Sequence, residues 1–151
     1  MTFARRICVI IGTLSWMVDA HAQTTLGELL DAGAKPLPLA RFKEELVQRI
    51  ISGPTASGGN IEIMYATNGT IEGKGLLRAQ RTTPPAVVRG EWTTDELGRV
   101  CTSMVIYGAA ATPGARLPSR CQSWFKLGDK YFFSDSDTDR SAKVLSRTIK
   151  Q

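Results

Sequence analysis

Histidine is almost absent from this chain, and the single one lies close to the amino terminus. The 151 residues include one histidine, His21, and three cysteines, Cys8, Cys101 and Cys121. The rest of the chain therefore cannot supply a Ser-His-Asp or Cys-His mechanism, or a histidine ligand to zinc or haem iron. Catalysis there would have to use carboxylates, lysine or tyrosine. We assign no catalytic residue, metal or cofactor from the sequence.

Long apolar runs are also missing. Residues 7–18 form an apolar stretch that is shorter than the roughly 20 residues of a membrane-spanning helix. The stretch follows Arg5 and Arg6 and precedes Ala20-His21-Ala22, which is the pattern of a secretory signal peptide. We predict a signal peptide at residues 1–22, no transmembrane anchor, and a periplasmic or secreted location. The alternative is an uncleaved amphipathic amino terminus.

Blocks of like charge are absent too, although the chain has a net charge of +5. The lysines and arginines are scattered, so a nucleic-acid partner is not expected for an exported protein. A weak attraction to anionic envelope polymers is compatible with the charge. The length and the lack of a long linker predict a single β-rich domain with N-terminal helices over residues 23–151, and we expect a monomer.

The segment before residue 54 has helical signals. Thr25 and Glu28 have the spacing of a capping box, which predicts a short helix that ends near Gly33. Apolar residues then follow helical spacing across residues 39–52, with Gly53 and Pro54 as a stop signal. We predict an amphipathic helix over 39–52 that covers a sheet, with a membrane-surface helix as the alternative.

After residue 54 the pattern changes to the alternation of strands. Asn68-Gly69 indicates a two-residue hairpin turn, and residues 108–118 are predicted to form a long loop. Short strands are expected at residues 61–65, 70–77, 87–94, 99–107, 120–127, 130–134 and 143–149. The predicted fold class is α+β: an N-terminal amphipathic helix packed on a small antiparallel β meander, either an open barrel or a sandwich.

Cys101 and Cys121 lie on consecutive predicted strands at the two sides of the 108–118 loop. Two cysteines in an exported protein usually pair, so we predict a disulfide between them. A bridge of this span would stabilise the fold by roughly 3 kcal/mol. The alternative is two free buried thiols.

Three carboxylates in a run, Asp135, Asp137 and Asp139, could begin a calcium loop. An EF-hand needs glycine at the sixth position and glutamate at the twelfth, and these positions hold Arg140 and Ser146. A solvated turn is therefore the favoured interpretation. A glycosidase pair is a further possibility, but nothing fixes a separation among Glu62, Glu72, Glu91, Asp95 and Glu96.

The aromatic residues Trp92, Trp124, Tyr131, Phe132 and Phe133 lie within predicted strands, so we expect them in the core rather than on a ligand-binding platform. Residues 131–133 must send side chains to both faces of one strand. The second face therefore needs cover, which we expect from the helix that begins at Leu39.

Several short motifs resemble the exported bacterial proteins known as the domain of unknown function 995 family. They are Gly53-Pro54, Asn68-Gly69-Thr70-Ile71-Glu72-Gly73, Gly90-Glu91-Trp92, Gly98-Arg99-Val100-Cys101, Cys121 with Trp124, and Lys126-Leu127-Gly128-Asp129-Lys130-Tyr131. The resemblance spans about residues 36–134. The family commonly has aspartate where this chain has Asn68, a change that suits a turn equally well. The resemblance implies export from a Gram-negative bacterium and a small β-rich domain, and it transfers no catalytic residue.

Three function hypotheses follow. The first is a non-catalytic exported protein that binds a protein or envelope component, for example as an inhibitor, with the 108–118 loop as the surface to test. The alternative is a small-ligand carrier with a barrel-type pocket. The third is a carboxylate-dependent hydrolase.

Overall fold

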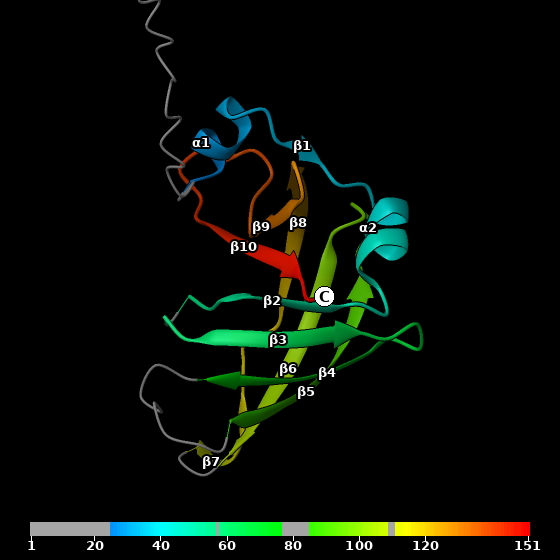
Figure 1. Ribbon diagram of the computed structural model, residues 1–151, viewed down its shortest axis with the longest axis vertical. Helices are drawn as coiled ribbons and strands as arrows, with labels where there is room; N and C mark the ends of the chain where they lie inside the picture. Colours follow the sequence, from blue (N-terminus) through cyan, green and yellow to red (C-terminus); the bar gives the residue numbers. More distant parts are fainter. Residues whose placement is uncertain (1–24, 57, 77–84, 109–110) are drawn as a thin grey trace, which may run out of the picture.

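Ten strands and two short helices occupy the part of the chain that the computed structural model describes, residues 25–56, 58–76, 85–108 and 111–151 (Figure 1). The predicted signal peptide lies outside these residues. The helices are α1 (Leu26–Asp31) and α2 (Leu39–Leu46). The strands are β1 (Lys35–Pro36), β2 (Ile50–Pro54), β3 (Asn60–Tyr65), β4 (Thr70–Leu76), β5 (Ala86–Thr94), β6 (Val100–Gly108), β7 (Ala111–Arg116), β8 (Arg120–Leu127), β9 (Lys130–Ser134) and β10 (Val144–Ile149).

Eight of these strands close into an antiparallel barrel. The order around the barrel is β8-β9-β10-β2-β3-β4-β5-β6, and β6 then pairs with β8. The pairing that closes the barrel is short and joins Val100 to Gln122, Cys101 to Cys121 and Thr102 to Arg120. The expectation of an antiparallel, β-rich fold is confirmed, but the barrel is closed, not open, and it is not a sandwich. Strand β1 adds to β8, and β7 adds to β6.

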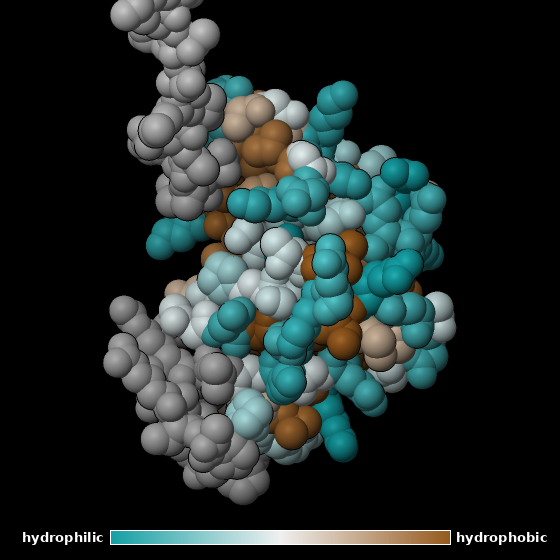
Figure 2. Space-filling view, viewed as in Figure 1, coloured by the Kyte–Doolittle hydropathy of each residue, from teal (hydrophilic) through white to brown (hydrophobic). Residues whose placement is uncertain are grey.

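The main core lies inside the barrel and follows the alternation of the strands. On β3, for example, Ile61, Ile63 and Tyr65 are buried, whereas the intervening Glu62 forms ion pairs with Lys74 and Lys150. Figure 2 shows the same contrast from outside, because the face over β2–β5 is mainly hydrophilic with separate apolar patches. Within the described residues, no helix is long and apolar enough to span a membrane.

A second, smaller core lies outside the barrel wall. Tyr131 and Phe133 point into the barrel, while Phe132 points outward from the same strand. Phe132 is covered by Leu26 and Leu29 of the α1 segment. The prediction that the helix beginning at Leu39 covers this face is therefore wrong. The capping box that starts α1 is confirmed, since the Glu28 amide donates to the Thr25 hydroxyl and the Thr25 amide to the Glu28 carboxylate.

Helix α2 is shorter than the predicted helix over 39–52. The backbone becomes extended at Val47, and Gln48 adopts a left-handed φ of 65°. Ile50 then begins β2, which pairs with β3 along its whole length. The helical spacing of apolar residues continues through Ile50, but the gain from strand pairing in the barrel outweighs this local preference.

Two turn predictions also need correction. Residues 108–118 are not a simple loop, because β7 pairs with β6 through Arg116 with Val105 and through Ala115 with Ile106. The β3–β4 connection is not a two-residue Asn68-Gly69 turn, since the Ala66 amide donates to the Thr70 carbonyl oxygen at 2.9 Å and the Gly69 amide donates to the Ala66 carbonyl oxygen at 3.1 Å. Gly69 has a φ of +86° there, as a residue without a Cβ readily does.

A candidate ligand cavity inside the barrel

Helix α2 closes one end of the barrel, at the right in Figure 1, with a cluster of aromatic rings. Phe42 is fully buried, and its ring centroid lies 5.3 Å from that of Tyr65, 5.8 Å from Trp92 and 5.1 Å from Trp124. Trp92 also donates from Nε1 to the Ala66 carbonyl oxygen at 2.8 Å. These aromatic residues therefore belong to the core, as predicted, and they fill this end.

A polar network holds α2 against the barrel wall. Glu45 Oε2 accepts hydrogen bonds from Lys126 Nζ at 2.6 Å and from the Tyr131 hydroxyl at 2.7 Å, and Arg41 pairs with Oε1. The hydrogen bonds from Lys126 and Tyr131 hold the pKa of Glu45 below its ordinary value. The network joins the helix to β8 and β9, and its hydrogen bonds are charge-assisted.

The opposite end of the barrel contains a cavity of about 290 Å³. Two strands run from the cavity at one end of the barrel to the aromatic cluster at the other. Strand β3 begins at Asn60 and Ile61, which line the cavity, and ends at Tyr65 in the aromatic cluster. Likewise β5 begins at Ala86 beside the cavity and reaches Trp92 in the cluster.

The cavity wall is mainly apolar and has small residues where two strands begin or end. Gly75 and Ala86 occupy inward positions on the adjacent strands β4 and β5, where they leave space that larger side chains would fill. The apolar side chains around that space are Ile61, Val88, Met104, Ile106, Leu117, Phe133 and Leu145. A mainly apolar wall with few polar groups is typical of small-molecule sites.

Arg147 is the one charged side chain in the cavity wall that is almost completely buried, with 6% of its surface exposed. Its Nη1 donates to the carbonyl oxygens of Pro54 at 2.7 Å and Ser146 at 2.8 Å. Its guanidinium carbon lies 4.7 Å from the ring centroid of Phe133. In the described residues its Nε has no hydrogen-bond partner, and no carboxylate forms a salt bridge with it.

Burial lowers the pKa of Arg147 to about 10. Removal from water disfavours the charged guanidinium, but this pKa still leaves Arg147 protonated at neutral pH. The cavity wall therefore contains a positive charge that donates to two carbonyl oxygens, lies over an aromatic ring and interacts electrostatically with Tyr65.

The mouth of the cavity is polar and adjoins a wider groove of about 830 Å³. Asp135 accepts hydrogen bonds there from Arg120 at 3.0 Å and from Gln122 at 2.9 Å. Strand β8 changes neighbours at this point, because residues 120–122 pair with β6 and residues 123–127 pair with β9. The cavity and the groove share Thr55, Ala56, Arg120, Gln122, Phe133 and Leu145.

The remaining predicted site candidates are the carboxylates of the acidic run and those of the hydrolase hypothesis. Asp135 is occupied by Arg120 and Gln122, while Asp139 accepts from the amide and hydroxyl of Ser141. In the described residues this acidic run does not bring three metal-ligating groups together. Of the candidate hydrolase carboxylates, Glu72, Glu91 and Glu96 are exposed, and Glu62 pairs with two lysines.

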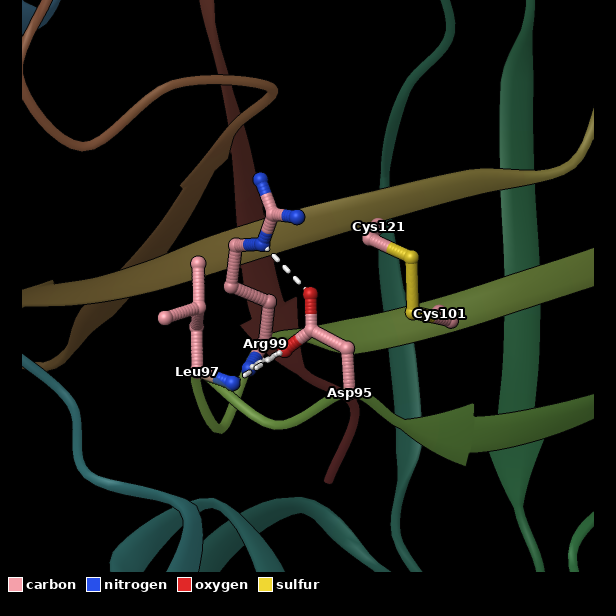
Figure 3. The surroundings of a disulfide bond; sticks show 5 residues. All are labelled: Asp95, Leu97, Arg99, Cys101 and Cys121. Atoms are coloured by element: carbon pink, nitrogen blue, oxygen red, sulfur yellow. Dashed lines mark hydrogen bonds and ion pairs between the residues drawn. A yellow bond between two sulfur atoms is a disulfide. The ribbon is translucent and has the colours of Figure 1, made fainter.

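The predicted disulfide between Cys101 and Cys121 is present (Figure 3). It joins β6 to β8 at the short pairing that closes the barrel. The Asp95 carboxylate lies nearby, with its oxygen and the two sulfur atoms all within 4.8 Å of one another. Because both sulfurs are in the bridge, they are not available as metal ligands.

Asp95 organises the turn beside this disulfide. It accepts from the amides of Leu97 and Arg99, and Arg99 Nε approaches its second oxygen at 2.7 Å (Figure 3). Burial alone would raise the pKa of Asp95, but these hydrogen bonds hold it below its ordinary value. The role of Asp95 in the structure is thus to stabilise the turn.

Sequence reasoning offered a barrel-type pocket as an alternative, but it did not identify the residues of the cavity or Arg147. The available signal was the position of Arg147 on the same face of its strand as Leu145, two residues earlier. That signal was weak, because Val144 on the opposite face is also apolar and buried in the second core.

Comparisons with family models, with curated proteins and with solved structures find no match for this chain. The resemblance to the domain of unknown function 995 family therefore stays a prediction.

Proposed function

We propose that this protein is a non-catalytic binding protein that holds a small, mainly apolar ligand inside its barrel. The observation that carries the proposal is the cavity of about 290 Å³ at the end opposite α2. Ligand sites commonly have volumes of roughly 300–1,000 Å³, so this cavity suits a small molecule. Of the three hypotheses drawn from the sequence, the small-ligand carrier agrees best with this geometry.

The arrangement of the two ends supports the proposal. One end is filled by aromatic rings, so apolar side chains bury one another there. At the other end, apolar side chains surround space while the strands around them remain paired. A ligand in that space would bury this apolar surface at a gain of about 25 cal/mol per Å².

The proposed export, the resemblance and the envelope association fit a carrier of this kind but do not identify its ligand. A soluble periplasmic or secreted location would bring such a protein into contact with small amphiphilic molecules of the envelope. A protein partner bound through residues 108–118 is the broader hypothesis, and native mass spectrometry of purified protein distinguishes the two by the mass that stays bound.

Calorimetric titration with octanol tests the proposal directly. We expect one octanol per chain and a negative heat-capacity change, which is the mark of apolar burial. Gly75→Leu should fill the cavity and lower octanol affinity at least tenfold, as estimated from the roughly 1.5–3 kcal/mol that a buried leucine-sized contact is worth.

The matched control is Lys74→Leu, which adds the same side chain to the outer face of the same strand. It should leave octanol affinity unchanged. Wild-type protein that binds none of octanol, octanoate and octyl phosphate would contradict the proposed function, as would equal octanol binding by Gly75→Leu and wild type. Circular dichroism establishes that each variant is folded, and Gly75→Ala is the milder substitute.

A further inference from the structure

The position of Arg147 in the cavity is unusual for a side chain with a full charge. Charged groups are almost never completely buried unless they are paired. Arg147 is 6% exposed, yet no carboxylate in the described residues forms a salt bridge with it. Its Nε is buried and has no hydrogen-bond partner there. The binding capacity of this guanidinium is therefore only partly used.

The same contacts hold the guanidinium in one place. Nη1 is fixed by the carbonyl oxygens of Pro54 and Ser146, and the guanidinium carbon lies over the ring of Phe133. The main-chain pairing of β10 with β2 stops at Thr148 and Ser52. Beyond that point, the hydrogen bond from Arg147 to the Pro54 carbonyl oxygen joins the two strands. A fixed guanidinium in a cavity wall suits an oxyanion, because its positive charge attracts anionic oxygen atoms and its N–H groups are hydrogen-bond donors.

We infer that the cavity ligand is a small amphiphile whose single oxyanion head group, a carboxylate or a phosphate, pairs with Arg147. The inference rests on the proposed function and adds the chemical class of the ligand. The apolar part of the ligand lies against the wall formed by residues such as Val88, Ile106 and Leu145. The head group supplies the negative charge that the described protein residues do not.

The polar mouth is compatible with entry of an anion. Arg120 is at the mouth and about half exposed, and its partner Asp135 also accepts from Gln122. Deeper in the wall, Arg147 is the charged side chain that borders the apolar space. An incoming anion therefore exchanges its hydration for a cation in a region of low dielectric constant, where the attraction is stronger.

Matched titrations of octanoate and octanol at neutral pH test this inference, because the two share an alkyl chain and differ in head-group charge. Wild-type protein should bind octanoate at least tenfold more tightly than octanol. Octyl phosphate distinguishes the source of the oxyanion: tighter binding than octanol by either anion supports the inference, and the tighter of the two identifies the head group.

Substitution of Arg147 tests the residue. Arg147→Met keeps an apolar stem of similar length, and it should weaken octanoate binding by roughly 10- to 100-fold, the usual range for a hydrogen bond to a charged group. Octanol affinity should change less than threefold. Arg147→Lys keeps the charge without the planar fork and should give an intermediate octanoate affinity.

Arg89→Met is the matched control, since Arg89 is exposed on β5 and its loss changes the net charge equally. It should leave both affinities unchanged. A purely structural role of Arg147 would lower octanol and octanoate binding alike, which would overturn the inference. Should Arg147→Met fail to fold, the wild-type ratio of octanoate to octanol binding decides.

The outcomes separate the two proposals. Wild-type protein that binds octanol as tightly as both anions would overturn the inference about the head group and leave the proposed function in place. Protein that binds neither octanol nor either anion would contradict the proposed function and the inference with it.

Discussion

The two ends of this barrel are built from the same strands, but the interior of one end is tightly packed and the interior of the other contains a cavity. At one end, Phe42 of α2 enters between Tyr65, Trp92 and Trp124, and the rings pack together. At the other end, Gly75 and Ala86 leave a cavity whose wall includes the buried Arg147. The end closed by α2, called the closed end below, gains stability from packing. The end with the cavity lacks that contribution.

The difference shows how a small barrel divides its interior between stability and binding. Closely packed interiors stabilise a fold, and each large void lowers that stabilisation. A cavity at one end is tolerated when the rest of the molecule is well held. Here the aromatic cluster, the disulfide and the Glu45 network lie outside the cavity. We therefore expect substitutions at the two ends to affect different measurements.

The largest effect on stability is expected from Phe42→Ala at the closed end. Removal of this fully buried ring leaves a hole among aromatic neighbours, and it should lower the free energy of unfolding by about 3–5 kcal/mol. Urea denaturation followed by circular dichroism measures the change. Lys43→Ala on the exposed side of the same helix should change it by less than about 0.5 kcal/mol. Similar changes in the free energy of unfolding for both variants would contradict the conclusion that Phe42 of α2 fills this end of the barrel.

The disulfide should have the next largest effect, because it fastens the short β6–β8 pairing that closes the barrel. Replacement of both Cys101 and Cys121 by alanine should cost roughly 3 kcal/mol, from the greater freedom of the unfolded chain. Octanol titration of the folded variant shows whether the cavity persists. A loss below about 0.5 kcal/mol would mean that strand pairing alone holds this seam.

Two glycines on β4 sharpen the comparison along a single strand. A Cβ at Gly73 would overlap the Glu62 carbonyl oxygen, whereas a Cβ at Gly75 would lie 3.4 Å from the Asn60 carbonyl oxygen and 3.8 Å from Ile61 Cγ1. Gly73→Ala should therefore destabilise the protein by about 1–3 kcal/mol. Gly75→Ala should be neutral or stabilising by up to about 1 kcal/mol, since alanine restricts the unfolded chain. Thermal unfolding measures both variants, and a lower stability of Gly75→Ala than of Gly73→Ala would refute this account.

The smallest effect is a pH dependence at the closed end. The pKa of Glu45 is lowered in the folded protein, so the unfolded chain binds a proton more readily as the solution becomes acidic. The stability that Glu45 contributes is complete above its ordinary pKa of 4.5 and is lost as the pH falls below that value. Glu45→Gln should therefore show a weaker loss of stability below pH 4.5 than wild type. Glu44→Gln, on the exposed neighbour, should retain the wild-type profile.

Local patterns in the sequence were enough for several elements of the fold. The capping box at Thr25 and Glu28 predicts the start of α1, and the alternation in residues 61–65 predicts β3 and its inward face. The strands predicted at residues 120–127 and 130–134 are confirmed with the same bounds, and Leu127 pairs directly with Lys130. Interactions between residues close in sequence determine these features, so a single sequence shows them.

The pairing of Cys101 with Cys121 was also predictable, although it joins residues far apart. Only two cysteines follow the expected signal peptide, and they lie on either side of one loop. Because two cysteines allow only one pairing within a chain, the expected oxidising compartment was enough to predict this disulfide. The location of the bridge at the closing seam of the barrel was not predictable, because that depends on which strands become neighbours.

The sequence by itself determined the antiparallel strands, the disulfide and the lack of histidine chemistry beyond His21. Tertiary structure alone decided that the barrel closes, that α2 ends at Leu46, and that Phe132 lies under α1. It also decided that Arg147 lines the same cavity as Gly75, Ala86 and Phe133. The physical reason is that closure and cavities depend on side chains from many strands at once, whereas propensity and alternation describe one segment at a time.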